Sequence, residues 1–374
     1  MDRLQILHVI NCDELLEIVA KGAQILNDKL FPSIISLKLW NLPNLRCIYP
    51  GISILIWPKL EELDILHCQM LKFFSAKVPK SPGSHSKGQK KFPTSRKPFV
   101  SLAKATPQLK LLSLGEKEVA MIEKGKLYID LPELYSLNLQ CFSDVSDVFA
   151  FDQTSEHTPP PSIENLEVVY STFEEIFPSK VSKYHRMSKL LSQFKGLKLQ
   201  TLPQLKSIGL EPSWMEYFVG ELETIFVKDC NCLTNLTPSD KRVSFSNLRE
   251  LKVEDCLGLE YLFSFSTAKS FRVLKELHVT NCGSLQNIVA VENKNKDGNS
   301  IRFVELEFLT LTLLPKLECF YSGSSTLNFP SLKKVLISEC YNMKAFCYGE
   351  AVTEELKVAV NGVCLEADLN NMML

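Results

Sequence analysis

The sequence lacks the features that direct a chain to a membrane, to the secretory pathway or to nucleic acid. No apolar run reaches the roughly 20 residues that a transmembrane helix needs. Asp2 and Arg3 lead directly into an apolar repeat at Leu4, so we expect no secretory signal peptide. The net charge of −1 gives no overall attraction for nucleic acid or an anionic membrane surface. We therefore expect a cytoplasmic protein, without membrane insertion and without a nucleic-acid partner.

Patterns of reactive groups are also missing. Gly83 and Gly88 have the spacing of a phosphate-binding loop, but Gln89 follows where such a loop needs lysine. Cysteine is plentiful, yet Cys230-x-Cys232 has no second cysteine or histidine pair to complete a zinc site. We therefore expect no catalytic residue, no metal, no cofactor and no enzymatic activity.

What the sequence does contain is one spacing, L-x-x-L-x-(V/I/L)-x-x-C-x-x-L, that recurs from end to end. The cleanest copies begin at Leu222, Leu248 and Leu274, and in other copies a Leu-Pro pair such as Leu42-Pro43 replaces the cysteine. Twelve units can be traced, with first residues at 4, 34, 60, 109, 134, 163, 194, 222, 248, 274, 306 and 332. This period and internal spacing are the leucine-rich-repeat signature, with one short strand and one return segment in each unit.

The spacing also predicts how the units are arranged. The L-x-(V/I/L) pair has the period of a strand, so both apolar side chains point into the core while their neighbours point outward. One unit cannot bury its apolar side alone, and must therefore stack on its neighbours. We predict an α/β solenoid, a leucine-rich-repeat horseshoe with a parallel concave β-sheet and an irregular or short-helical convex side. It would span residues 1–349, with an insertion at 77–98 and a C-terminal cap or tail at 350–374.

Half of the twelve cysteines occupy a single position of the repeat. Equivalent positions in successive units point the same way, and a free cysteine packs as a small hydrophobic residue. We expect regular, buried, reduced thiols at these positions, which are Cys12, Cys68, Cys230, Cys256, Cys282 and Cys340.

The insertion at 77–98 is basic and rich in proline and glycine, with no acidic residue. Two interpretations are open: a solvated loop of the kind that solenoids tolerate, or a contact surface for an acidic partner or an acidic patch of the same chain. The residues of this basic loop that would make such a contact are Lys87, Lys90, Lys91, Arg96 and Lys97.

The cysteine-containing repeat, its Leu-Pro alternates and the phrase Phe329-Pro330-Ser331-Leu332-Lys333 ahead of a strand resemble one family. It is the leucine-rich-repeat region of plant intracellular (coiled-coil, nucleotide-binding, leucine-rich-repeat) disease-resistance proteins. The resemblance implies a module of an innate-immune receptor that senses pathogen effectors, or host proteins that they modify, in plant defence. The P-loop and other nucleotide-switch motifs of a full receptor do not occur in this sequence. The alternative is a leucine-rich-repeat substrate receptor of a ubiquitin ligase.

A protein ligand would contact the outward residues of the concave strands. Interfaces favour aromatic anchors among polar groups, and the three outward aromatic residues stand out for this reason, although isolated exposed aromatics are also normal on any surface. The candidate protein-binding residues are Trp40, Lys38, Asp64, Phe226, Lys228, Glu250, Lys252, Glu254, Glu276, His278 and Phe308. A second expected partner is a nucleotide-binding domain, docked at the apolar N-terminal edge of the first unit.

Overall fold

The computed structural model describes residues 2–20, 30–50, 56–71, 106–116, 133–141, 163–176, 194–208, 220–237, 243–292, 300–353, 357–360, 363–365 and 369. The chain divides into two compact units. One comprises residues 1–135 with 147–162, and the other comprises 136–146 with 163–374. The basic loop at 77–98 lies outside the described residues, as do its candidate residues Lys87, Lys90, Lys91, Arg96 and Lys97.

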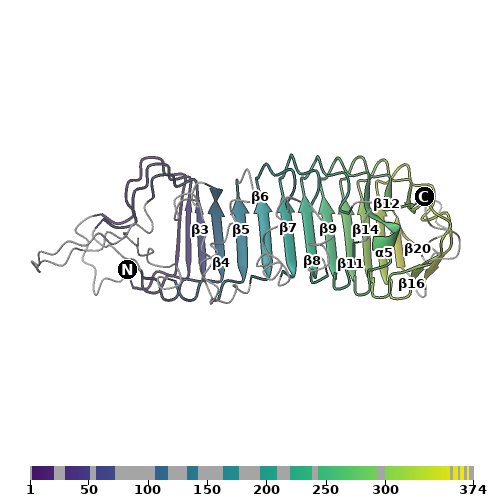
Figure 1. The fold of residues 1–374 in the computed structure, drawn as a ribbon, viewed down its shortest axis with the longest axis horizontal. Helices are drawn as coiled ribbons and strands as arrows, with labels where there is room; N and C mark the ends of the chain where they lie inside the picture. The colour runs from purple at the N-terminus through teal and green to yellow at the C-terminus, as the bar shows by residue number, and fades with distance from the viewer. Residues whose placement is uncertain are drawn as a thin grey trace, which may run out of the picture. The chain divides into compact units, whose positions relative to one another are not determined.

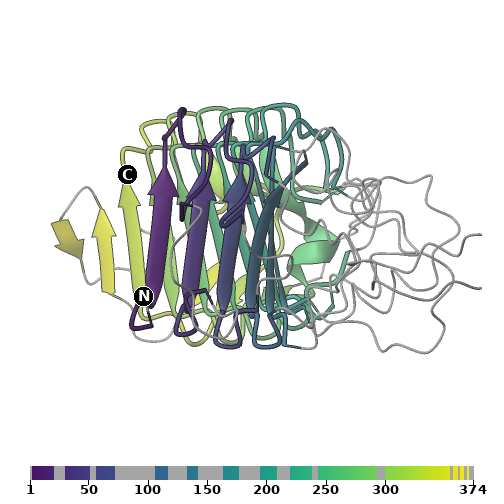
Figure 2. The ribbon, with the colours of Figure 1, turned by 90° about the vertical axis from the view of Figure 1, so that its left-hand side faces the viewer.

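The described residues of the N-terminal unit form four parallel strands in chain order, which Figure 2 shows as neighbouring arrows. They are β1 (Ile6–Ile10), β2 (Ser36–Trp40), β3 (Glu62–Leu66) and β4 (Leu111–Gly115). Equivalent leucines pair in register, so that Leu37 lies beside Leu63 and Leu63 beside Leu112. All three are buried, as the predicted inward position requires.

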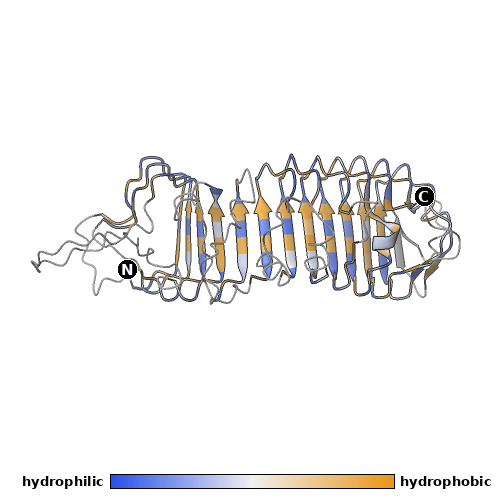
Figure 3. Ribbon diagram, viewed as in Figure 1, coloured by the Kyte–Doolittle hydropathy of each residue, from blue (hydrophilic) through white to orange (hydrophobic). Residues whose placement is uncertain are grey.

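The second unit continues the same pattern over a longer run (Figure 1). Its parallel strands are β5 (Ser136–Gln140), β6 (Asn165–Val169), β7 (Gly196–Gln200), β8 (Thr224–Lys228), β9 (Glu250–Glu254), β11 (Glu276–Thr280), β14 (Phe308–Thr312) and β17 (Lys334–Ser338). The sheet ends with β19 (Lys357–Val360) and the antiparallel β20 (Val363–Leu365). Ile225, Leu251 and Leu277 pair in register and are buried. Apolar and polar residues alternate along the strands in Figure 3.

The return side of the second unit differs from the prediction. Its described residues form two small parallel sheets, β10 (Tyr261–Ser264) with β12 (Asn287–Ala290) and β15 (Cys319–Tyr321), and β13 (Ile301–Arg302) with β16 (Leu327–Phe329) and β18 (Ala351–Thr353). Among the described residues of this return side, the α-helical segment is the short α5 (Phe265–Ala268), which Ser264 caps. The repeat solenoid and its parallel sheet are thus observed. The α/β class and the short-helical convex side are not confirmed.

Phenylalanine fills the space between the main sheet and the return side. Phe303 and Phe329 stack with ring centroids 5.1 Å apart, and Phe320 and Phe346 stack at the same separation. Edge-to-face contacts join the two pairs, for example Phe303 with Phe320 at 5.8 Å. Each such contact adds about 0.5–1.5 kcal/mol to the stabilisation from burial. The aromatic stack therefore stabilises the packing of neighbouring units in this part of the chain.

Most strands of the main sheet are followed by the same turn. The residue after the strand adopts a left-handed backbone conformation, with φ of 52° at Asp229, 55° at Asp255 and 54° at Asn281. Asparagine and aspartate tolerate this conformation better than most residues. Its N–H donates to the last carbonyl of the next strand, as from Asp255 to Thr280 and from Asn281 to Thr312. The turns thus link successive units through a hydrogen bond outside the strands.

The cysteine position lies directly after this left-handed residue. Cys68, Cys230, Cys256, Cys282 and Cys340 are buried free thiols, as predicted. The thiols of Cys68 and Cys340 donate to carbonyls of the preceding unit, Leu39 and Leu311. The prediction was wrong for Cys12, which is exposed: its unit contains β1, the edge strand, and no other unit lies over it in the described residues.

Candidate functional site

The outward side chains of the strands form one open face in each unit. The first, third and fifth residues of a strand point outward, and parallel register places equivalent residues side by side. The sequence-predicted residues are all at such positions. Lys38, Trp40 and Asp64 lie on β2 and β3 of the N-terminal unit, and the second unit carries Phe226, Lys228, Glu250, Lys252, Glu254, Glu276, His278 and Phe308 on β8, β9, β11 and β14.

In the N-terminal unit the three predicted residues form one cluster. The Lys38 ammonium lies 3.8 Å from the centroid of the Trp40 ring and 3.5 Å from Oδ2 of Asp64. The cation therefore covers the aromatic ring that the sequence suggested as an anchor. The indole Nε1 of Trp40 is buried and has no hydrogen-bond partner among the described residues.

Charged residues at the C-terminal ends of β8 and β9 form a connected network. The ammonium of Lys228 lies 3.0 Å from Glu254 and 3.3 Å from Asp255, and that of Lys252 lies 2.9 Å from Glu254. The hydrogen bond from Lys252 is the largest contribution that lowers the pKa of Glu254, and the bond to Glu254 raises the pKa of Lys228. These groups stay charged near neutral pH. Three of the predicted contact residues, Lys228, Lys252 and Glu254, are thus paired within the protein.

On the neighbouring strands the predicted residues are less constrained. His278 Nε2 lies 3.1 Å from Oε2 of Glu276 on the same strand. Phe308 on β14 pairs with Glu276 in the backbone register and has 37% of its side chain exposed. The described residues contain no group of three potential metal ligands. This part of the face offers separate polar and aromatic contacts.

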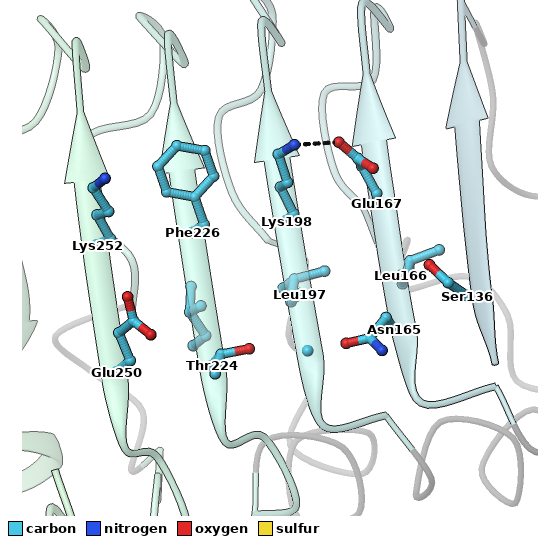
Figure 4. Close-up of a pocket in the computed structure, with 12 residues that line it drawn as sticks. Ser136, Asn165, Leu166, Glu167, Leu197, Lys198, Thr224, Phe226, Glu250 and Lys252 are labelled. Carbon is cyan, nitrogen blue, oxygen red and sulfur yellow. Dashed lines mark ion pairs between the residues drawn. The ribbon is translucent and has the colours of Figure 1, made fainter. Parts of the chain in front are cut away.

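A hollow of about 450 Å³ opens on the face of the second unit (Figure 4). It extends from β5 to β9 and includes predicted residues only at its β8 and β9 side. Its lining residues are Ser136, Asn165, Leu166, Glu167, Gly196, Leu197, Lys198, Thr224, Ile225, Phe226, Glu250 and Lys252.

Phe226 lies between two lysines in this hollow. The Lys252 ammonium is 5.5 Å and the Lys198 ammonium 5.9 Å from the centroid of its ring, and Figure 4 shows the three side chains in a row on adjacent strands. Both distances fall within the range of cation–π attraction. Lys198 also forms an ion pair with Glu167. The arrangement presents an aromatic ring with positive charge on two sides.

Sequence reasoning missed the β6 and β7 side of the hollow, which includes Asn165, Gly196 and Lys198. The repeat copies beginning at Ile163 and Phe194 depart from the leucine consensus, so their outward residues did not stand out. One signal was available, because a glycine inside a strand often marks a close approach of other groups. Gly196 is such a position.

No helix in the described ranges has the length and apolar character needed to cross a membrane.

Comparison with protein-family models matches residues 237–356 to plant disease resistance protein RPS2-like, leucine-rich repeats. Over these residues the match confirms the resemblance found from the repeat spacing. No curated protein and no solved structure matched the chain. Solenoids of this repeat class are typically recognition domains and not catalysts. The family match and the fold together indicate a protein-interaction repeat module.

Proposed function

We propose that this chain is the protein-recognition module of a plant innate-immune receptor, and that it senses pathogen effectors, or host proteins that effectors modify, in the cytoplasm. The single observation that carries the proposal is the open face of the second unit. Phe226 and Phe308 are displayed there among charged side chains, on a sheet whose opposite side is fully packed. Protein interfaces are enriched in aromatic residues of this kind, surrounded by polar groups.

The family match supports the immune part of the proposal, because residues 237–356 fall within the leucine-rich repeats of disease-resistance proteins. They include β9, β11, β14 and β17, and therefore most of the predicted contact residues of the second unit.

Proximity labelling in plant cells tests this function. The full chain, fused to a labelling enzyme, is expressed with and without bacterial infection, beside a face variant that combines Glu276→Lys with Phe308→Ser. Arg302→Glu is the matched control, since Arg302 is exposed on β13 of the return side. We expect proteins labelled only on infection, lost in the face variant and retained in the control. Equal labelling by all three chains would refute recognition through this face.

We also propose that a nucleotide-binding domain docks at the edge strand β1. The exposed fractions of Ile6 and Ile10 are 60% and 41%, and Leu7 is only half-buried, whereas the equivalent Leu37 on β2 is 1% exposed. Co-expression with the nucleotide-binding domain of a related receptor should raise the soluble yield of the wild-type chain. The gain should be lost in Ile6→Asp, while Arg302→Glu, which changes a residue of the other unit, should keep it. A soluble yield that does not change on co-expression would contradict the docking.

A further inference from the structure

Two glutamates on the open face of the second unit depart from the way in which its charges are arranged elsewhere. Opposite charges usually meet on neighbouring strands, as where Lys228 on β8 contacts Glu254 on β9 at 3.0 Å. Glu250 on β9 and Glu276 on β11, in contrast, pair in register at the first position of their strands. Like charges directly opposite each other destabilise a sheet. The two carboxylates therefore form a local excess of negative charge.

The nearest basic groups leave this charge uncompensated. Glu250 is exposed and forms no ion pair among the described residues, and it lies below Lys252 on the same strand in Figure 4. The Lys252 ammonium is instead 2.9 Å from Glu254. Glu276 has one close partner, Nε2 of His278 at 3.1 Å, and 43% of its side chain is exposed. A cation from outside the chain can therefore approach both carboxylates.

An aromatic ring lies beside the pair. Phe308 on β14 is in register with Glu276 and is 37% exposed. Lys334 is in register with Phe308 on its other side, so the carboxylates and the ring are adjacent to each other without an intervening lysine. A guanidinium can stack on an aromatic face and donate hydrogen bonds to carboxylates at the same time.

These contacts favour arginine over the other cationic side chain. The guanidinium is planar, weakly hydrated and carries five donors, whereas the lysine ammonium is a compact and strongly hydrated charge with three donors. An acidic side chain at the same place would meet two carboxylates of its own sign, at a cost in repulsion. The charge and the ring together therefore specify one kind of partner group.

Building on the function proposed above, we infer that Glu250, Glu276 and Phe308 form the anchor site for an arginine side chain of the protein partner. The guanidinium stacks on the Phe308 ring and donates to the carboxylates of Glu276 and Glu250. Neighbouring strands lie about 4.8 Å apart, so one guanidinium between them is within reach of both flexible glutamate side chains. The bound cation also removes the repulsion between the two carboxylates.

One consequence is measurable without any ligand. Because Glu250 and Glu276 repel each other, Glu250→Gln should raise the midpoint of urea unfolding. Glu260→Gln is the matched control, since Glu260 is an exposed glutamate directly before β10 on the return side, and its midpoint should equal that of the wild type. A lower midpoint in Glu250→Gln would show that this carboxylate is stabilised within the folded chain, and would overturn the inference.

Binding of labelled peptides to the full chain tests the arginine site itself. The probes are three otherwise identical 12-residue peptides of glycine and serine with one central arginine, lysine or citrulline, the last being an uncharged analogue of arginine. Fluorescence anisotropy at low salt should show the arginine peptide binding about three-fold more tightly than the lysine peptide, and at least ten-fold more tightly than the citrulline peptide. Raising the salt concentration should weaken its binding, because the ion pairs are screened.

Variants locate the binding on the face. Glu250→Gln and Glu276→Gln should each weaken binding of the arginine peptide by about ten-fold. Phe308→Leu should weaken it by about three-fold and should abolish the preference for arginine over lysine, because the ring is lost while the apolar volume is kept. Glu260→Gln should bind as the wild type does. Circular-dichroism melting of each variant shows that it is folded.

Three binding results would overturn the inference: no binding of the arginine peptide at millimolar concentration, equal binding of the citrulline peptide, or an equal loss in Glu260→Gln. The proposed function fails differently. If proximity labelling is lost in the face variant while arginine and citrulline peptides bind equally, recognition through the face stands and the arginine anchor is wrong. If the arginine peptide binds as expected while proximity labelling is equal in all chains, the anchor stands and the immune function is wrong.

Discussion

Replacing Leu251 by alanine tests the stacking of the units directly. Leu251 is 1% exposed and pairs in register with Ile225 on one side and Leu277 on the other. The substitution removes three carbon atoms, which at about 0.8 kcal/mol for each buried methylene is about 2.4 kcal/mol. The cavity that remains between two fixed neighbours adds to this, so we expect a loss of about 2–5 kcal/mol in the free energy of unfolding.

The matched control is Leu7→Ala, at the same position of the repeat in β1. Leu7 is only half-buried, since β1 has a neighbouring strand on one side in the described residues. We expect Leu7→Ala to cost about 1 kcal/mol, less than the burial of a whole leucine contributes. Urea unfolding followed by circular dichroism measures both losses, and hydrogen exchange shows whether protection falls first in β8, β9 and β11. An unchanged unfolding midpoint for Leu251→Ala, or equal losses for the two variants, would refute the assignment of this residue to an inter-unit core.

Two further predictions concern titrating groups. The hydrogen bond from Asn281, and after it the one from Lys228, lowers the pKa of Asp255 below its usual 3.8. A group whose pKa is lowered by folding stabilises the folded chain at pH values above its unfolded pKa, so the free energy of unfolding should fall as the pH drops below about 4. The fall should be smaller in Asp255→Asn, as urea midpoints measured at several pH values would show. An equal acid dependence in both chains would contradict this role. Burial raises the pKa of Cys282 to about 12. Iodoacetamide at about pH 8 should therefore modify the exposed Cys12 and Cys232 before it modifies Cys282, as peptide mass spectrometry would show. Rapid modification of Cys282 in the folded chain would contradict its burial.

The strands of the main sheet were predictable because their signal is strong and local. Leu251-x-Val253 and Leu277-x-Val279 fix the inward side of a strand without further information, and register follows once equivalent pairs stack. The return side carried no such signal. Segments such as Tyr261–Ser264 contain leucine and aromatic residues at spacings that suit a short strand or a helical turn, and only their pairing with the neighbouring unit decides between them.

The contact residues were predictable one strand at a time, but their grouping was not. That Phe226 points outward follows from its place between Ile225 and Val227. That it lies between two lysines depends on the strands before and after it, and Lys198 belongs to a copy of the repeat that begins with Phe194 in place of leucine. The asparagine or aspartate before four of the six repeat cysteines, as in Asp255-Cys256, was a readable signal for the left-handed turn that sequence reasoning left unused.

The left-handed turns have a consequence for how such a chain can change over generations. Each turn donates its hydrogen bond to the following unit at an equivalent position, so the junction between neighbours is nearly the same from Cys230 through Cys256 to Cys282. A recombination event that duplicates, deletes or exchanges one whole unit would recreate an intact junction on both sides. The outward side chains of that unit would be exchanged together. The contact surface could therefore change while the buried residues of the neighbouring units stay the same.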